Sequence, residues 1–197
     1  MNMNMDMNVN MDQLAAHNRF WVLQKFTLMV NRYTVSVAGP DGSVGPEVCF
    51  VEQKRMAFKE EVTFRRDGVP AFRFKARKVM DLGATYDVTT VDGAEIGLFR
   101  KNFGQSLLRS TWHLQQPGLP EVTGQERSMA VALLRRVQDA IPLPVHFDFA
   151  SPDGHPIMSL SRKFGLRDKY LLEVHDNALD RRLAISMAVA LDALQAR

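Results

Sequence analysis

Histidine and cysteine are the residues of this 197-residue chain that could build a metal centre or a nucleophilic site, and their spacing fits neither. No two histidines stand four residues apart around a glutamate, and Cys49 has no second cysteine to assist it. Zinc sites need such residues at short, characteristic spacings. We expect no metal and no cofactor, and we expect Cys49 to be a buried, inert thiol. The histidines are His17, His113, His146, His155 and His175.

Motifs for nucleophilic catalysis or phosphate binding are also absent. The sequence contains no G-x-S-x-G elbow, no P-loop and no dinucleotide fingerprint. The sequence contains four Asp-Gly dipeptides, and neither DVTTVDG nor DFASPDG has the alternating oxygen ligands of an EF-hand loop, so hairpin turns explain the dipeptides better. We therefore expect no catalytic residues and a protein that is not an enzyme. The dipeptides are Asp41-Gly42, Asp67-Gly68, Asp92-Gly93 and Asp153-Gly154.

Clustered basic residues are the remaining candidate site. If these residues bind anionic lipid, each cation near the membrane surface would contribute about 1 kcal/mol to the binding free energy. As a solvated outer face, the same cations would pair with Glu52, Glu60 and Glu61 on neighbouring strands. Both interpretations stay open, and the chain's net charge of +3 excludes neither. The candidates are Arg73, Lys75, Arg77, Lys78, Arg100, Lys101, Arg162 and Lys163.

The elements that carry these cations have the alternation of half-buried strands. In AFRFKARK, Phe72 and Phe74 fall on one face and Arg73 and Lys75 on the other; EVTFRR and KYLLEV alternate in the same way. About a dozen such runs lie between the turn signals, as in an antiparallel sandwich or barrel. The sequence predicts a mainly β fold.

An internal repeat supports a sheet that grows by hairpins. Residues 86–104 match residues 147–165 at a displacement of 61 positions, with the Asp-Gly turn and the final Phe-Gly aligned. Each copy is predicted to form a strand, a turn, a second strand and a basic turn. Each copy ends shortly after one of the basic pairs. The chain's first third resembles the same unit more loosely.

Two helices are expected besides the strands. Thr123 and Glu126 have capping-box spacing ahead of an apolar stripe formed by Met129, Leu133 and Val137. The second helix, at about 180–194, contains LAISMAVALDAL and is apolar on every side, as in a buried helix. We expect Asn177 or Asp180 to cap it, and Arg181 and Arg182 to lie in solvent at its start.

The number of strands and the apolar character of the last helix together predict a closed antiparallel barrel of about twelve strands around a buried hydrophobic C-terminal helix. Barrels of about eight strands are filled by side chains and those of sixteen or more leave a channel, so about twelve leave room for one helix. We expect residues 1–18, rich in Met and Asn, to be a disordered tail, and residues 19–197 to form one domain. No secretory signal and no membrane-spanning segment is expected, which places the protein in the cytoplasm or at the inner membrane face.

Several runs resemble bacterial members of the LURP-one-related family, within the tubby C-terminal-like superfamily that also contains phospholipid scramblases. They are FVEQKRMAFKEEVTF, FKARKVMDLGATYDV, FRKNFGQSLLRSTWHL, SRKFGLRDKYLLEV and LDRRLAISMAVALDAL. The resemblance covers residues 19–194 and implies a twelve-stranded barrel around a central helix with no prosthetic group. Tubby proteins bind phosphoinositides through basic surface residues, but their motif has no residue-by-residue counterpart here. The acylated cysteines, proline-rich region and calcium loop of scramblases are missing as well.

We expect a non-enzymatic binding or scaffold domain whose partner is an anionic phospholipid surface or another protein. A nucleic-acid or transcription-regulatory module is an alternative, less favoured because the phenylalanines beside the cations face inward, away from bases. A small-molecule binder with a pocket at the barrel rim is the other alternative. The oligomeric state is left open.

Overall fold

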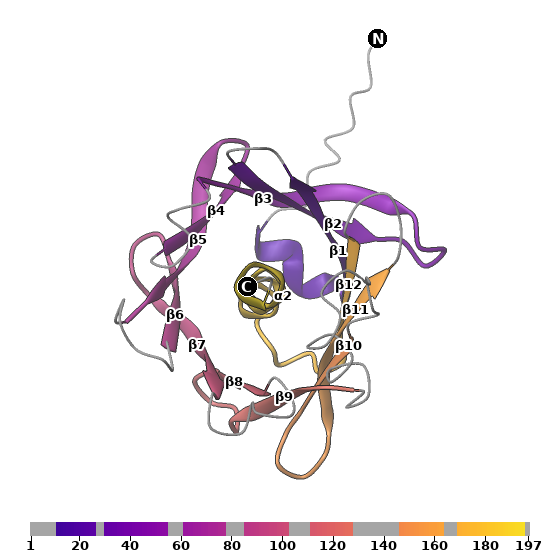
Figure 1. Cartoon of the computed structure of the whole chain (residues 1–197), viewed down its shortest axis with the longest axis vertical. Helices are drawn as coiled ribbons and strands as arrows, with labels where there is room; N and C mark the ends of the chain where they lie inside the picture. Colours follow the sequence, from indigo (N-terminus) through magenta and orange to yellow (C-terminus); the bar gives the residue numbers. More distant parts are fainter. Residues whose placement is uncertain are drawn as a thin grey trace, which may run out of the picture.

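Twelve antiparallel strands close into one barrel in the computed structural model, which describes residues 11–26, 30–54, 61–77, 85–102, 111–127, 146–163 and 169–195. Each strand pairs with the next along the chain, and the first pairs with the last (Figure 1). The predicted closed barrel is confirmed. The strands are β1 (Arg19–Phe26), β2 (Val30–Ala38), β3 (Val44–Lys54), β4 (Glu61–Arg66), β5 (Val69–Ala76), β6 (Thr85–Thr90), β7 (Glu95–Asn102), β8 (Thr111–Gln115), β9 (Val122–Glu126), β10 (His146–Ala150), β11 (Pro156–Lys163) and β12 (Lys169–Val174).

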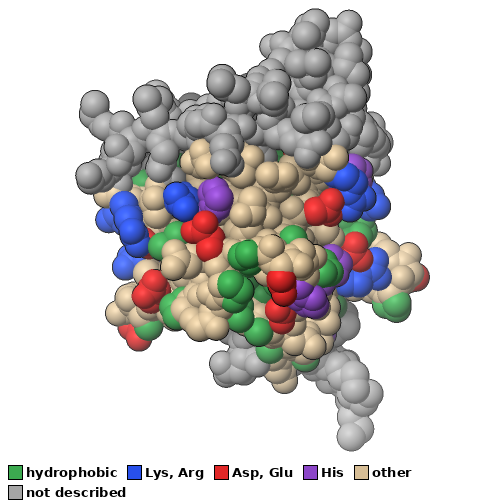
Figure 2. Space-filling view, turned by 90° about the horizontal axis from the view of Figure 1, so that it is seen from below, with side chains coloured by type: hydrophobic (Ala, Val, Ile, Leu, Met, Phe, Trp, Pro, Cys, Tyr) green, Lys and Arg blue, Asp and Glu red, His purple; other side chains and the backbone are tan. Residues whose placement is uncertain are grey.

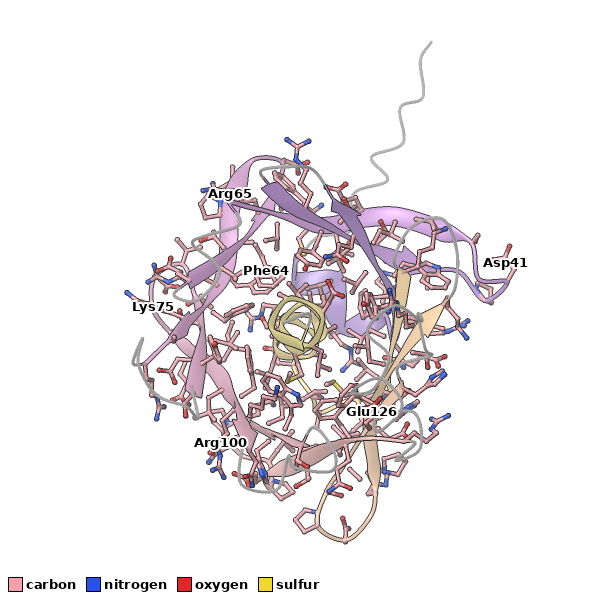
Figure 3. The ribbon with its side chains drawn as sticks, viewed as in Figure 1. Asp41, Phe64, Arg65, Lys75, Arg100 and Glu126 are labelled. Carbon is pink, nitrogen blue, oxygen red and sulfur yellow. The ribbon has the colours of Figure 1, made fainter. Side chains whose placement is uncertain are left out.

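Alternation along the strands builds the inner wall of the barrel. Phe72 and Phe74 in β5 are fully buried, and so are Val62 and Phe64 opposite them in β4. The Phe64 and Phe72 rings stack with their centroids 4.3 Å apart. Figure 3 shows Phe64 pointing inward. The predicted inward faces of these strands are therefore confirmed.

All four Asp-Gly dipeptides form turns, but of two kinds. At Asp67-Gly68 both residues have positive φ, 48° and 80°, as a two-residue type I′ hairpin requires. At Gly42, Gly93 and Gly154 only the glycine has positive φ, and its amide donates to the carbonyl oxygen three residues earlier. Glycine supplies the left-handed residue of these longer loops. The repeated hairpins 86–104 and 147–165 thus share one turn geometry.

Alternating strand direction gives the barrel two distinct ends. The hairpin turns that the structure describes lie between β2 and β3, β4 and β5, β6 and β7, β8 and β9, and β10 and β11, so they share one end, here named the turn end. Strands β5, β7, β9 and β11 finish at the opposite end, where β12 begins; we name it the distal end.

The C-terminal helix α2 (Arg181–Gln195) runs from the turn end towards the distal end. In Figure 1 it is seen end-on within the ring of strands. Its side chains from Leu183 to Leu191 are buried, and it contacts β5, β7 and β12. The Asp180 carboxylate accepts a hydrogen bond of 2.8 Å from the Arg182 amide, which makes Asp180 the N-cap, one of the two predicted.

The prediction that Arg181 lies in solvent was wrong, because the side chain is only 3 % exposed. Its guanidinium donates to the carbonyl oxygens of His17 (2.9 Å) and Leu179 (2.6 Å) and to Asn18 Oδ1 (2.6 Å). It also donates to oxygens of Ala15, Asp176 and Asn177. Burial of the guanidinium lowers the pKa of Arg181. The oxygen ring compensates for that burial without a carboxylate.

Two further predictions need correction. Residues 11–18 were expected to belong to a disordered tail, yet Met11–Ala16 forms the 3-10 helix η1 and Leu14 lies in the core. Thr123 and Glu126 were expected to start a helix but lie in β9, where pairing with β8 and β10 overrides the capping-box pattern. Residues 1–10 and the rest of that expected helix, 128–142, lie outside the described residues.

Because Gly97 has no side chain, α2 can pack closely against β7 at this position. A Cβ atom at this position would lie 2.5 Å from the carbonyl oxygen of Gln115 and 2.7 Å from Leu183 Cδ2. Because the backbone oxygen cannot rotate away, we expect Gly97→Ala to lower the free energy of unfolding by about 1–3 kcal/mol. Urea denaturation measures the change. Gly45→Ala, whose Cβ would lie 3.0 Å from its nearest atom, serves as the milder comparison, and an unchanged midpoint in Gly97→Ala contradicts the close packing.

Candidate functional site

The predicted basic residues lie around the barrel and do not form one lateral patch. Arg73 and Lys75 on β5 share Glu61 of β4, at 3.5 and 3.9 Å. Arg100 on β7 pairs with Glu121 at 3.1 Å. Figure 3 shows Lys75 and Arg100 pointing outward from one side of the barrel, whereas β11 lies on the other side in Figure 1. Lys78 and the side chains of Glu52 and Glu60 lie outside the described residues.

Arg77 and Asp87 form a bidentate ion pair that links β5 to the first strand of the repeated hairpin. The two hydrogen bonds from Arg77 Nε measure 2.9 and 2.8 Å, and a further contact from Nη2 measures 2.7 Å. These bonds raise the pKa of the Arg77 guanidinium. The Arg77 guanidinium is thus held by Asp87, although the ion pair is exposed to solvent.

An equivalent pair in the second copy shows that the repeat is larger than the sequence indicated. Arg127 follows β9 as Arg77 follows β5, and it donates to Asp148 at 2.7 and 2.6 Å. The backbone amide of each arginine also donates to the first strand of its hairpin, to Thr85 at 2.9 Å and to His146 at 2.8 Å. Sequence comparison missed Arg127 because the connections after the two arginines differ in length, which breaks the displacement of 61 positions.

In each basic pair of the repeat, the two side chains point to opposite faces of the strand. Lys101 lies 5.7 Å from the ring centroid of Trp112, and Arg162 lies 6.0 Å from that of Tyr170, in both cases the residue opposite on the next strand. Trp112 and Tyr170 belong to the core, so Lys101 and Arg162 face the interior. Their sequence neighbours Arg100 and Lys163 face outward.

Lys163 on β11 and Lys169 on β12 form the least compensated pair of cations. They stand directly opposite each other in the strand register, and both are exposed. Among the contacts of the described residues, neither has a carboxylate partner. Like charges opposite each other are unfavourable by a few tenths of a kcal/mol, so a bound anion would relieve the repulsion. The sequence identified Lys163 but missed Lys169, because only the register shows that the two meet.

The charge of Lys163 acts on the neighbouring His146. The pKa of His146 is lowered, first by burial and then by the positive charges of Arg127 and Lys163. The neutral ring pairs through Nδ1 with Ser161 Oγ at 3.0 Å. Arg127 and Lys163 therefore both lie close enough to His146 to disfavour its protonation.

Ser159 and His175 are the arrangement most similar to a nucleophile and its base. Ser159 Oγ lies 3.0 Å from His175 Nε2. The nearby Asp148 carboxylate, however, accepts both of its strong hydrogen bonds from Arg127. Bound in that way, Asp148 does not orient His175 as the third member of a catalytic triad.

In the described part of the chain, neither Cys49 nor the remaining histidines belong to a recognisable reactive site. Cys49 is fully buried, and burial raises the pKa of its thiol, so the reactive thiolate is disfavoured. Across residues 11–195, apart from the gaps given above, no group of three or more His, Cys, Asp or Glu side chains could hold a metal ion.

Comparison with known proteins identifies one family. The family model described as LURP-one-related matches residues 47–192, most of the chain. Neither the curated proteins nor the solved structures contain a match. Within the described residues, no helix has the length and apolar character needed to cross a membrane.

Proposed function

This chain belongs to the LURP-one-related family, and we propose that it is a non-enzymatic binding domain that recognises anionic phospholipid headgroups on the outer surface of its barrel. Its place would be the cytoplasmic side of a membrane, bound peripherally. Lys163 and Lys169 would make the main contact with the headgroup phosphate.

An interior occupied by α2 would favour recognition at the surface of the barrel. Barrels that hold a small molecule keep an open central cavity. Here we propose that α2 is the central core, since its side chains from Leu183 to Leu191 are buried among those of the strands. A ligand inside the barrel would have to displace this helix. The outer wall and the two ends remain as binding surfaces.

The opposed lysines are the observation that carries the proposal. Arg73, Lys75, Arg77 and Arg100 each have a carboxylate within 4 Å, and binding a phosphate would compete with that ion pair. Lys163 and Lys169 have no such competitor among the described residues, and they repel each other across the two strands. Phosphate oxygens between two ammonium groups would gain attraction without breaking an ion pair to any described residue.

Catalysis receives no comparable support. Among the hydrogen bonds of the described residues, no carboxylate orients the Ser159–His175 pair, and the Cys49 thiol is buried. Nucleic-acid binding is also disfavoured, because the exposed large hydrophobic residues of the described chain are Val44, Val69 and Val91, none of which can stack on a base.

Removing the two lysine charges is expected to weaken binding to vesicles of phosphatidylcholine with phosphatidylserine. At about 1 kcal/mol for each lysine, Lys163→Gln/Lys169→Gln should bind about thirtyfold more weakly in co-sedimentation at low salt. The matched control is Val69→Glu/Val91→Glu, which changes the net charge equally at exposed positions of the turn end. Equal loss in both variants would indicate a general charge effect and contradict the site.

A further inference from the structure

Aspartate followed by glycine is a pair of residues that can react with each other in water. The amide nitrogen of the glycine attacks the side-chain carboxyl carbon of the aspartate, water leaves, and a succinimide ring forms. Glycine permits the attack because it has no side chain to shield its nitrogen.

Exposure to solvent does not distinguish the four Asp-Gly pairs of this chain. In every pair both residues are exposed. Figure 3 shows Asp41 at the tip of its hairpin, away from the barrel. Acidic side chains also lie open on the outer surface in Figure 2. Any difference in reactivity in the folded protein must therefore come from the bonds that the two reacting groups make in each turn.

In three of the turns, a hydroxyl group two residues away binds the aspartate carboxylate. Asp41 Oδ1 accepts hydrogen bonds from the Ser43 hydroxyl at 2.6 Å and from the Ser43 amide at 3.0 Å. The hydroxyl bonds lower the pKa of all three carboxyl groups, and the ionised form is a poorer target for a nucleophile than the neutral acid. The other two hydroxyl bonds run from Thr90 to Asp92 and from Ser151 to Asp153.

The same three turns also bind the glycine amide, which is the nucleophile. Each amide donates to the carbonyl oxygen three residues earlier, and it must give up that bond before it can attack. Each hydrogen bond that has to break slows the attack by about two- to tenfold. The bonds run from Gly42 to Gly39 (3.0 Å), from Gly93 to Thr90 (3.2 Å) and from Gly154 to Ser151 (2.9 Å).

The pair Asp67-Gly68 has neither restraint. The positions two residues from Asp67 are Arg65 and Val69, which carry no hydroxyl group. Among the contacts of the described residues, the Asp67 carboxylate accepts one long hydrogen bond, 3.4 Å from Arg66 Nε, and the side chain is 69 % exposed. The Gly68 amide donates no backbone hydrogen bond to a described residue. Carboxyl group and nucleophile are therefore both available at this turn.

We propose that Asp67-Gly68 is a site of spontaneous covalent modification, at which the folded protein forms a succinimide and then isoaspartate. A bond forms between Gly68 N and Asp67 Cγ, while the amide hydrogen and the carboxyl hydroxyl leave as one water molecule. Water then opens the ring at either carbonyl carbon. Breaking the new bond restores aspartate, and breaking the original peptide bond leaves isoaspartate. No oxidant, reductant or other reactant takes part, and the reaction is independent of lipid binding.

Isoaspartate changes the hairpin because its main chain runs through Cβ and Cγ. The two-residue turn between β4 and β5 would gain one main-chain carbon atom. That turn sets the register in which Arg66 stands opposite Val69 and Phe64 opposite Phe72. The modification therefore acts on the hairpin that carries the stacked rings of the inner wall.

Uptake of heavy oxygen measures the reaction at all four pairs in one experiment. The full chain is incubated at neutral pH in water enriched in oxygen-18, where each opening of a succinimide adds one heavy oxygen atom. The protein is then cut with a lysine-specific protease in ordinary water, and fragmentation in a mass spectrometer locates the label. Asp67 lies in the peptide 60–75 and is its only aspartate. The same incubation in guanidinium chloride, where no turn survives, gives the intrinsic reactivity of each pair.

In the folded protein, Asp67 is expected to take up label about tenfold faster than Asp41, Asp92 and Asp153, because two hydrogen bonds restrain each of those pairs. In guanidinium chloride the four rates are expected to become similar. Equal uptake at all four pairs of the folded protein, or faster uptake at another pair than at Asp67, overturns the proposal. Label that reaches Asp67 only after unfolding also overturns it, because the tight turn itself would then prevent the attack.

Thr90→Val tests whether the hydrogen bonds set this order. The substitution removes the hydroxyl donor to Asp92 but keeps the shape of the side chain and the carbonyl oxygen that binds the Gly93 amide. Uptake at Asp92 is expected to rise by about two- to tenfold, while uptake at Asp67 stays the same. An unchanged rate at Asp92 contradicts the proposed protection.

Discussion

Met187→Asp is expected to unfold the domain. Met187 is fully buried in the middle of α2, where every side chain from Leu183 to Ala190 is less than 1 % exposed. Losing the methionine from the core costs about 2–5 kcal/mol, and the unpaired carboxylate adds several more. Against a total stability of about 5–15 kcal/mol, the sum leaves little or no folded protein. Circular dichroism during urea titration measures the loss of a cooperative transition.

Val91→Asp is the matched control for this substitution. It introduces the same carboxylate in place of a hydrophobic residue, but at a turn position that is 50 % exposed. Its unfolding midpoint is expected to stay within the normal range for surface changes, about 0.5 kcal/mol. A soluble, cooperatively unfolding Met187→Asp protein would contradict a helix that fills the barrel.

Arg181→Met is expected to release the N-terminal segment from the barrel. The guanidinium joins carbonyl oxygens of residues 15 and 17 to those of residues 176 and 179, so its loss leaves buried acceptors without donors. Each buried acceptor that loses its donor typically costs about 1–3 kcal/mol. Amides of residues 14–18 should exchange hydrogen faster in the variant, and the urea midpoint should fall.

Arg182→Met provides the comparison at the adjacent position. Arg182 is half-buried and pairs with Asp180 at 2.6 Å, a contact with the neighbouring helix cap. Its replacement is expected to cost about 1 kcal/mol or less and to leave the exchange of residues 14–18 unchanged. If both variants behave alike, the role of Arg181 as the link between the two segments is wrong.

The barrel could be predicted because its signals are local and periodic. Alternation in AFRFKARK and EVTFRR gave the inward faces, and the Asp-Gly dipeptides gave the positions of turns. Even so, the turn type at Asp92 and Asp153 was not predicted. Loop length rather than the dipeptide decides whether one or both residues take positive φ.

Local rules failed where tertiary pairing decided the outcome. Thr123 and Glu126 have the spacing of a capping box, but both are residues of β9 that pair with neighbouring strands. Arg181 sits beside Arg182 in the sequence, and nothing in that pair distinguishes the buried arginine from the half-buried one. Three of its acceptors come from residues 15–18, more than 160 positions away, and no local pattern brings them to Arg181.

The sequence named the candidate residues one by one but not how they are arranged on the barrel. The sequence found Arg100, Lys101, Arg162 and Lys163 as two equivalent pairs, whereas strand parity turns one cation of each pair inward. Lys169 was missed because its relation to Lys163 depends on the register between β11 and β12. The described candidates lie towards one end of the barrel, and this follows from the topology rather than from composition or spacing.

Co-sedimentation of the unmodified protein with vesicles tests recognition of anionic lipid most directly. Neutral phosphatidylcholine vesicles are compared with phosphatidylserine-containing and phosphoinositide-containing vesicles, at low and at physiological salt. Binding to the anionic vesicles alone, weakened by salt as expected for surface cations, is the predicted result. Equal sedimentation with neutral and anionic vesicles, or none with either at low salt, contradicts it.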